Sequence, residues 1–229
     1  MKLSVVMPIY NEEATLEAIV AKVQATPFEK EILLVDDGSK DRSREIMAQL
    51  EKDHENIRCF YHEENKGKGG ALATGFKNID GDVVIIQDAD LEYDPEDYKV
   101  LLRPIEEGKA DVVFGSRFLG GPYVRVHMFY HYLGNRGLTF LSNMFTNLNL
   151  TDMETCYKVF KRDVASKLDI QSKTFAVEPE ITAKVARMKV RIYEVPISYA
   201  GRDYSEGKKI GPKDAVIAVF AILRWALMA

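Results

Sequence analysis

Residues 82–92 read DVVIIQDADLE, an apolar run that ends in a cluster of carboxylates. Valine and isoleucine fill residues 83–86 without alternating with polar residues, as in a strand covered on both faces. Asp88, Asp90 and Glu92 follow at the carboxyl end of this strand, where open α/β sheets bind ligands. Carboxylate oxygens suit Mg²⁺ or Mn²⁺, and an ion held by one or two of them keeps positions open for phosphate groups. The stretch therefore predicts a buried strand with a metal-binding tip, with a solvated acidic turn as the alternative.

A strand, a polar loop and a helix recur three times before this stretch. The first strand is followed by YNEE at residues 10–13, and the second ends in DDGSKD at residues 36–41. The third leads into the glycine-rich loop NKGKGG at residues 65–70. Because parallel strands need crossover helices, this order predicts an α/β fold with a Rossmann-like, mostly parallel sheet flanked by helices. The predicted strands are residues 2–9, 31–35, 58–62 and 82–86, and the predicted helices are residues 16–23, 43–50 and 71–77.

The glycine-rich loop matches neither standard phosphate-binding fingerprint. It lacks the spacing of a P-loop, and no Gly-x-Gly-x-x-Gly follows the first strand, so an NAD-binding or P-loop protein is disfavoured. Gly69 and Gly70 are expected to permit a close backbone approach, because glycine has no Cβ. Lys66 and Lys68 face either a phosphate or solvent, and a basic cluster this short does not decide between the two.

Four motifs follow one another along the chain: VVMPIYNEE (5–13), VDDGS (35–39), NKGKG (65–69) and DAD (88–90). Three later segments are GSRF (115–118), DMETCYK (152–158) and GKKI (207–210). The four motifs in this order resemble family 2 glycosyltransferases with the GT-A fold, and the later segments are similar to the branch that includes dolichol-phosphate mannose synthase and its bacterial polyprenyl-phosphate relatives. The resemblance spans nearly the whole chain and implies an inverting enzyme, which moves a hexose from a nucleotide diphosphate sugar of the GDP-mannose or UDP-glucose type to a polyprenyl or dolichyl phosphate.

The resemblance also implies roles on the donor side. Breaking the sugar–phosphate bond adds negative charge to the departing nucleoside diphosphate, which a bound Mg²⁺ or Mn²⁺ stabilises. Asp90 and Glu92 are the first expected metal ligands, and Asp88 is expected to bind the ion or the ribose. Asp37 suits the base or ribose, since a carboxylate accepts from hydroxyl or ring N–H groups. The residues expected to bind the nucleotide are Pro8, Tyr10, Asn11, Glu12, Asp37, Lys66, Lys68, Asp88, Ala89 and Lys208.

The acceptor decides whether the reaction needs a base. A sugar hydroxyl has a high pKa and needs a general base, whereas a lipid phosphate is already anionic near neutral pH and needs only positive groups to hold it. Arg117, Arg136 and Arg202 are the expected phosphate clamps, with surface salt bridges as the alternative role. Asp152 is the carboxylate expected to act as base or to orient the acceptor. The expected catalytic residues are thus Asp90, Arg117, Asp152 and Arg202.

The composition of the 229-residue chain is that of one soluble catalytic domain, with 46% hydrophobic and 29% charged residues. A net charge of −4 argues against a nucleic-acid partner, because general nucleic-acid binders are usually basic. Cys59 and Cys156 are too few for a disulfide framework and are expected to be ordinary thiols in a reducing compartment. With no signal peptide evident, we expect a cytoplasmic protein at the cytoplasmic face of the membrane.

Two apolar segments indicate peripheral membrane contact. The terminal helix, residues 214–229, is counted apart from a GT-A catalytic domain of residues 1–213, and it is too short to span a bilayer of about 30 Å. It lies either in the membrane interface or buried against the domain. Residues 123–132 are rich in aromatic side chains and are expected to form a mobile surface element. Residues 138–145 are expected to belong to the core.

Two other functions stay open from the sequence. One is a soluble family 2 transferase that glycosylates a hydroxyl acceptor and depends on Asp152 or another carboxylate as base. The other is a non-catalytic nucleotide-sugar-binding module that has kept the fold. The motifs do not distinguish the base or the sugar of the donor.

Overall fold

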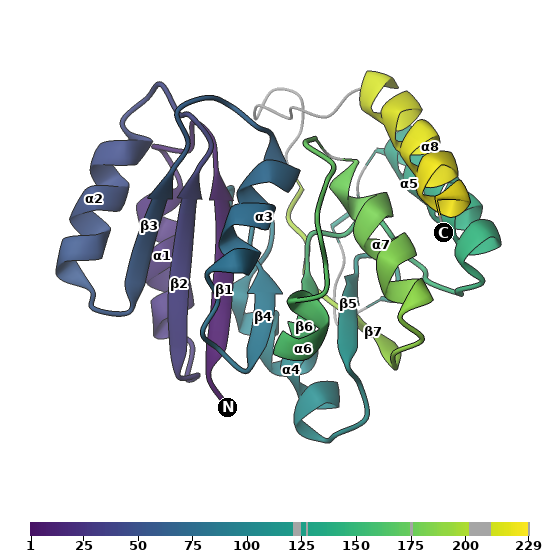
Figure 1. The fold of residues 1–229 in the computed structure, drawn as a ribbon, viewed down its shortest axis with the longest axis horizontal. Helices are drawn as coiled ribbons and strands as arrows, with labels where there is room; N and C mark the ends of the chain where they lie inside the picture. Colours follow the sequence, from purple (N-terminus) through teal and green to yellow (C-terminus); the bar gives the residue numbers. More distant parts are fainter. Residues whose placement is uncertain (121–124, 127, 175, 202–211, 229) are drawn as a thin grey trace.

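The computed structural model describes residues 1–120, 125–126, 128–174, 176–201 and 212–228. Within them the chain folds around a seven-stranded sheet in the order β3-β2-β1-β4-β6-β5-β7 (Figure 1). The central strand β4 is buried at all of its positions, as the unbroken run of valine and isoleucine predicts. The strands are β1 Leu3–Ile9, β2 Lys30–Asp36, β3 Ile57–Tyr61, β4 Val83–Ile86, β5 Val112–Ser116, β6 Lys158–Lys161 and β7 Ile192–Pro196.

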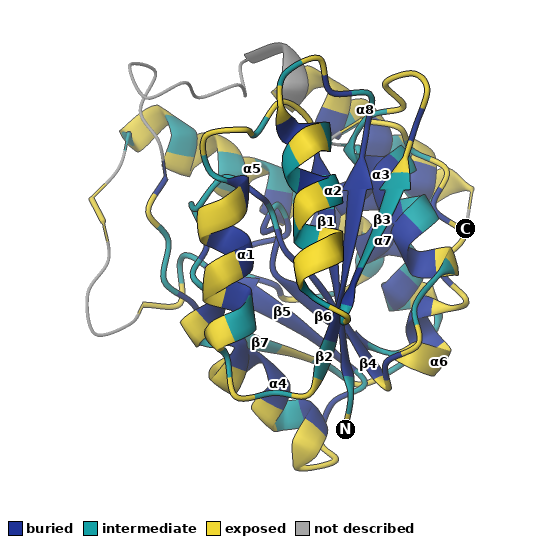
Figure 2. Ribbon diagram, turned by 90° about the vertical axis from the view of Figure 1, so that its left-hand side faces the viewer, coloured by how far each residue is buried: buried dark blue, intermediate teal, exposed yellow. Residues whose placement is uncertain are grey.

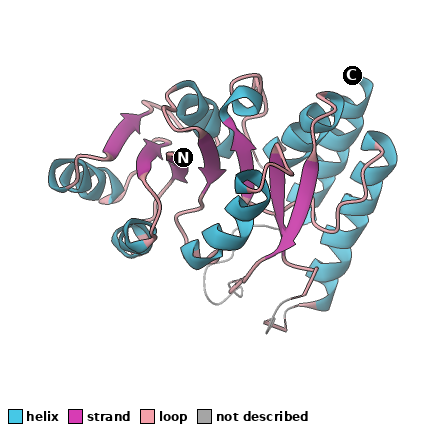
Figure 3. Ribbon diagram, turned by 90° about the horizontal axis from the view of Figure 1, so that it is seen from below, coloured by secondary structure: helices cyan, strands magenta, loops and turns pink. Residues whose placement is uncertain are grey.

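Helices lie on both sides of this sheet (Figure 3). Figure 2 shows α1 and α4 on one side and α6 and α7 on the other, with the buried strands between them. The predicted helices of the amino-terminal half are all present, and the helix expected over residues 71–77 begins three residues earlier. The helices are α1 Leu16–Ala25, α2 Ser43–Asp53, α3 Lys68–Lys77, α4 Tyr98–Glu106, α5 Phe129–Thr146, α6 Arg162–Ala165, α7 Val177–Arg187 and α8 Pro212–Leu227, with a 3₁₀ turn η1 at Pro95–Asp97.

The sheet is mostly parallel, as predicted, and β6 is the exception. β1 pairs in parallel with β2 and β4, β2 with β3, and β5 with β7, whereas β6 runs antiparallel between β4 and β5. The loops that follow the parallel strands therefore share an edge with the loop that precedes β6. This reversal brings residues 151–157 to the same edge as the carboxylates that follow β4.

The expectation that residues 138–145 belong to the core is wrong. Within α5 only Thr139 and Ser142 are buried, whereas Phe140 is 67% and Met144 63% exposed. Hydrogen bonds hold the inner side of the helix in place: the Thr139 hydroxyl accepts from the backbone N–H of Met153 at 3.1 Å, and the Asn143 amide bonds both backbone groups of Leu150. Most of the large apolar side chains of α5 are therefore exposed, while Leu138 and Leu141 are half-buried.

The terminal helix α8 packs against α5 and α7 at one end of the molecule (Figure 1). Its inner side is buried through Ala218, Ala221, Ile222 and Trp225, and its outer side exposes Phe220 by 67%. The predicted packing against the domain thus holds for one side of this helix, while the predicted membrane contact of the other side stays a prediction. Among the described helices, none is long and apolar enough to cross a bilayer.

Candidate active site

The carboxylate loop after β4, residues 87–92, is anchored by a buried glutamine. The Gln87 side-chain oxygen accepts hydrogen bonds from the hydroxyls of Tyr98 and Tyr157, each at 2.8 Å. Leu91 then turns the chain with a φ of 63°, and an Asp90 oxygen accepts from the N–H of Glu92 at 3.2 Å. The loop leaves the three predicted metal ligands half-buried at the edge of the sheet.

Each of these carboxylates also has a partner in the protein. Asp88 pairs through both oxygens with Lys68 Nζ, at 2.9 and 3.0 Å, and Glu92 accepts from the Tyr199 hydroxyl at 2.9 Å. In the described part of the chain, no group of three or more His, Cys, Asp or Glu side chains is arranged to hold a metal ion. The donor set still fits a divalent ion, because Mg²⁺ is commonly held by one or two carboxylates and completes its shell with phosphate oxygens and water.

Lys68 lies at the amino end of α3 and links the carboxylate loop to α7. Its Nζ is 3.2 Å from Glu178 Oε1, and Glu178 in turn pairs with the fully buried Lys158. Burial lowers the pKa of the Lys68 ammonium, but the charges around it, Asp88 foremost, outweigh burial and hold that pKa well above its usual value. Lys66 is exposed to solvent. The two lysines, weighed together in the sequence, thus have different surroundings.

Arg117 and Asp152 meet directly after β5. The Arg117 backbone N–H and Nε donate to one Asp152 oxygen at 3.0 and 2.7 Å, and Nη2 donates to the other at 2.8 Å. Asp152 is fully buried, and the guanidinium stacks on Tyr199, 5.1 Å from the ring centre. Since Tyr199 also binds Glu92, a continuous set of contacts connects the arginine to the carboxylate loop. Both Asp152 oxygens are engaged in positioning the arginine.

Glu154 lies near the Arg117–Asp152 and Lys158–Glu178 ion pairs, and it was not singled out from the sequence. It is half-buried, and its Oε1 atom is buried without a hydrogen-bond partner among the described residues. Burial, and after it the nearby Glu178 carboxylate, raises the pKa of Glu154 to about 7. Glu178 and Lys158 were missed as well. The sequence does indicate a buried ion pair at Lys158, because a lysine inside the apolar run CYKVF must be paired with a carboxylate if that run is buried.

The loops after β1 and β2 bind each other beside this site. Asn11 has a φ of 54°, its N–H donates to Ser39 Oγ at 3.0 Å, and its side-chain oxygen accepts from the Lys40 N–H at 2.8 Å. The Glu12 N–H donates to Ser43 Oγ at 3.0 Å. Pro8 and Glu12 are half-buried, and Tyr10 is 39% exposed.

Asp37 holds the glycine-rich loop. Its carboxylate accepts from the backbone N–H groups of Lys66 and Gly67, at 2.9 and 2.7 Å, and bonds His62 Nδ1 at 2.8 Å. The predicted close backbone approach is confirmed at Gly69, where a Cβ would lie 1.8 Å from the Ser172 carbonyl oxygen. The loop therefore packs against the protein's own backbone.

The remaining predicted residues are less well defined. Ala89 is buried between Asp88 and Asp90, and Arg136 is exposed on α5, where it donates to the Thr151 carbonyl at 3.3 Å. Arg202 and Lys208 lie outside the described residues.

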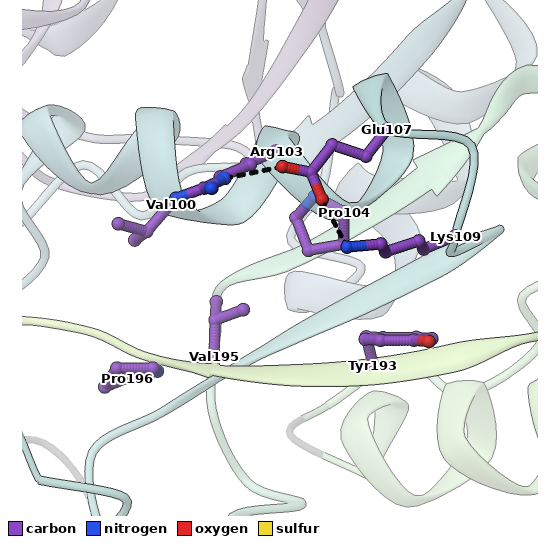
Figure 4. Close-up of a pocket in the computed structure, with 8 residues that line it drawn as sticks. All are labelled: Val100, Arg103, Pro104, Glu107, Lys109, Tyr193, Val195 and Pro196. Atoms are coloured by element: carbon purple, nitrogen blue, oxygen red, sulfur yellow. Dashed lines mark hydrogen bonds and ion pairs between the residues drawn. The ribbon is translucent and has the colours of Figure 1, made fainter.

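A pocket of about 330 Å³ between α4 and β7 has a different character (Figure 4). Glu107 pairs there with Lys109 and Arg103, each at 2.7 Å, on an exposed surface. These two cations, Lys109 first, lower the pKa of Glu107 to about 2. Its described lining includes none of the residues predicted from the sequence, so the candidate site is the edge that carries Asp88 to Glu92.

Solved glycosyltransferase structures share this fold. Glucosyl-3-phosphoglycerate synthase from Mycobacterium tuberculosis, in complex with Mn²⁺, UDP and phosphoglyceric acid, has a TM-score of 0.75 over 98% of this chain and 78% of that chain, at 19% identity. S. aureus TarS in complex with UDP-GlcNAc has a TM-score of 0.65 over 100% of this chain and 67% of that chain, at 20% identity. The predicted GT-A fold is thereby confirmed.

The protein is a member of glycosyl transferase family 2, whose model matches residues 4–169. Undecaprenyl-phosphate mannosyltransferase of Micrococcus luteus is 29% identical over 100% of this chain and 96% of that protein. UDP-N-acetylglucosamine–dolichyl-phosphate N-acetylglucosaminyltransferase of Methanococcus voltae is 28% identical over 87% and 86% of the two chains. Dolichol-phosphate mannosyltransferase of Pyrococcus furiosus is 28% identical over 98% of this chain and 64% of its own length. These similarities confirm the predicted branch of the family.

Proposed function

We propose that the protein transfers a hexose, with inversion, from a nucleotide diphosphate sugar to a polyprenyl or dolichyl phosphate. The observation that carries this proposal is the pairing of Arg117 with Asp152 beside the carboxylate loop. An oriented guanidinium suits an anionic phosphate acceptor, whereas a hydroxyl acceptor needs a base, and the predicted base Asp152 has both oxygens engaged. The names of the similar proteins from Micrococcus, Methanococcus and Pyrococcus, each a transferase acting on a lipid phosphate, support the same acceptor.

The donor would lie over the carboxylate loop. Asp90 and Glu92, with Asp88, would hold Mg²⁺ or Mn²⁺, which when bound offsets the negative charge of the diphosphate. Lys68 keeps Asp88 in place and adds a positive charge next to it. An acceptor phosphate oxygen attacks the anomeric carbon, the bond from this carbon to the diphosphate oxygen breaks, and the nucleoside diphosphate leaves with the electron pair.

The nucleoside would lie at the loops after β1 and β2. Tyr10 offers an exposed aromatic face there, and the hydrogen bonds of Asn11 and Glu12 to the second loop fix its position. Asp37 contributes by holding the backbone of Lys66 and Gly67, in addition to any contact with the nucleotide. Pro8 and Ala89, and Lys208 from outside the described residues, complete the proposed donor site.

The acceptor would approach from α5 and α8, whose exposed apolar side chains form what we call the apolar platform. Arg136 on α5 donates to the backbone of Thr151, next to Asp152, so the platform adjoins the acceptor side of the site. Large exposed apolar patches mark membrane or protein contacts, and we propose peripheral attachment at the predicted cytoplasmic face. Arg202 belongs to this proposed acceptor site through the family resemblance. The platform residues are Phe129, Tyr130, Leu133, Phe140, Met144, Phe145, Val216, Ile217, Phe220 and Leu227.

Acceptor-dependent release of the nucleotide tests this proposal. Purified protein is mixed with Mg²⁺ or Mn²⁺ and a panel of UDP- and GDP-sugars, with undecaprenyl phosphate or with saccharides. We expect release of UDP or GDP to rise with the lipid phosphate alone. Stimulation by saccharides alone would assign a hydroxyl acceptor, and nucleotide binding without release under any condition would indicate a non-catalytic module.

A further inference from the structure

Glu154 is a carboxylate without a hydrogen-bond partner among the described residues, and two buried oxygens near it, Thr155 Oγ1 and Glu178 Oε1, also accept or donate no hydrogen bond there. Glu154 Oε1 is buried with no hydrogen bond, and among the described residues the Glu154 side chain forms no ion pair. Buried polar atoms in native proteins nearly always have a partner, because an unpaired one costs about 1–3 kcal/mol. Glu154 therefore calls for a partner that the described residues do not supply.

The cations next to Glu154 are already committed. Lys158 has three N–H donors, and these reach Glu178 and the carbonyl oxygens of Met153 and Thr155. Arg117 donates from Nε and Nη2 to the two Asp152 oxygens, and its Nη2 also donates to Asn135 Oδ1 at 3.3 Å. Among the described contacts, neither cation donates a hydrogen bond to Glu154.

The charges on the two sides limit what can bind between them. The Asp152 and Glu178 carboxylates are both near enough for their charges to act on Glu154, and each is held by its own cation. A phosphate placed against Glu154 would meet a like charge, so the diphosphate and the lipid phosphate belong elsewhere in the site. A hydroxyl group is neutral and can donate to the carboxylate of this half-buried residue.

The hexose is the substrate group that is rich in hydroxyls. Glu154 is near Glu178, which is connected through Lys68 to Asp88 on the proposed donor side, and it is also near Arg117 and Asp152 on the proposed acceptor side. The transferred sugar must pass between those two sides. On the basis of the proposed function, we infer that Glu154 accepts a hydrogen bond from a hydroxyl of the hexose and helps to select the donor sugar.

Binding of the sugar nucleotide in the absence of an acceptor tests the inferred role of Glu154. Titration calorimetry with Mn²⁺ compares wild type, Glu154→Gln and the exposed control Glu106→Gln, using UDP, GDP, UDP-glucose and GDP-mannose as ligands. For the sugar nucleotide that wild type binds, we expect Glu154→Gln to weaken binding about tenfold to a hundredfold, as for a lost hydrogen bond to a charged group. Affinity for the matching UDP or GDP is expected to stay within twofold, because no sugar is present.

Deoxy analogues of that sugar nucleotide sharpen the result. The analogue lacking the contacted hydroxyl should bind wild type and Glu154→Gln equally, whereas the other analogues should keep the difference. Equal losses for the sugar nucleotide and the free nucleotide would reveal a structural role and overturn the inference. Unchanged binding with lost turnover would instead make Glu154 a base and also overturn it.

A failure of the proposed function can be distinguished from a failure of the inferred sugar contact. A wild-type protein that binds sugar nucleotides but releases UDP or GDP only with saccharides has a different acceptor, while the calorimetric comparison still decides the sugar contact. A wild-type protein that binds none of the four ligands contradicts both. Thermal unfolding of Glu154→Gln confirms that the variant is folded before binding is compared.

Discussion

Asp152 depends on Arg117 for its charge partner. Its carboxylate is fully buried, and the Arg117 guanidinium is its only cation among the described ion pairs. Burial lowers the pKa of Arg117, but the Asp152 charge outweighs burial and raises that pKa well above its usual value. The arginine is therefore charged at every pH at which the protein is folded. Its two-point contact with Asp152 fixes the plane that it would present to the phosphate of the proposed acceptor.

Removing the charge of Asp152 tests whether the carboxylate positions Arg117 or acts as a base. We expect Asp152→Asn to destabilise the fold by about 3–5 kcal/mol, because the buried Arg117 charge would be left without its partner. We also expect turnover to fall at all pH values. Denaturant unfolding and a pH profile of kcat measure the two effects. An unchanged stability, together with the loss of one ionisation from the profile, would show that Asp152 is a base.

Glu154 gives a pH-dependent prediction with a defined sign. Its pKa is about 7 in the folded protein against an ordinary value of 4.5, so the folded state binds the proton more tightly than the unfolded chain. Its ionisation therefore opposes folding, with no cost below about pH 4.5 and the full cost above about pH 7. We expect Glu154→Gln to match wild type at pH 4.5 and to be more stable by about 1–3 kcal/mol at pH 8. Urea unfolding at both pH values measures this; a constant difference between them would contradict the assigned pKa.

At the scale of elements, the contact between α3 and the loop before α7 sets the shape of the donor side. A Cβ on Gly69 would lie 1.8 Å from the Ser172 carbonyl, whereas a Cβ on Gly137 in α5 would meet nothing within 4 Å. We expect Gly69→Ala to lower the free energy of unfolding by several kcal/mol, because the backbone itself must move. Gly137→Ala is the control and should be neutral or stabilising by up to about 1 kcal/mol. Equal stabilities of the two variants in urea would show that the loop yields easily.

An element could be predicted where its sequence is compatible with only one structure. β4 is identified by unalternated valine and isoleucine, and the carboxylates after it fall at the ligand edge because the chain order requires parallel strands. The direction of β6 was not predictable, since a four-residue strand reads the same either way. The side of α5 that faces the fold was also hidden, because it is held by Thr139 and Asn143 rather than by apolar packing. Glu154 escaped notice because its significance lies in missing partners, which only a structure shows.

In the whole molecule, the proposed function would bring a lipid surface to the apolar platform and the nucleotide to the carboxylate loop. α5 joins them, because it exposes Phe140 outward and binds the backbone of Thr151 and Met153 on its inner side. A polyprenyl phosphate held in a bilayer could thus present its head group to Arg117 without leaving the membrane. The arrangement makes membrane binding and transfer separable by mutation.

Charged substitutions on the platform test this separation. We expect Phe140→Glu with Phe220→Glu to weaken sedimentation with anionic phospholipid vesicles at least tenfold, since two exposed apolar side chains would no longer enter the interface. Transfer to a short, water-soluble polyprenyl phosphate should stay within threefold of wild type. Val100→Glu on α4, an exposed apolar position away from the platform, is the control. Vesicle binding that is unchanged in the double variant would remove the platform from the membrane contact.

Mass spectrometry of the product shows whether the protein transfers a hexose to a lipid phosphate in a metal-dependent reaction. Wild-type protein is incubated with Mg²⁺ or Mn²⁺, each donor of the panel and a short polyprenyl phosphate, beside Asp90→Ala and a reaction containing EDTA. We expect a polyprenyl-phosphate hexose that forms with wild type and the metal, and that is absent both with EDTA and with Asp90→Ala, which remains folded by circular dichroism. A hexose found on the lipid phosphate at undiminished rate in Asp90→Ala, or found only on a saccharide, would contradict this expectation.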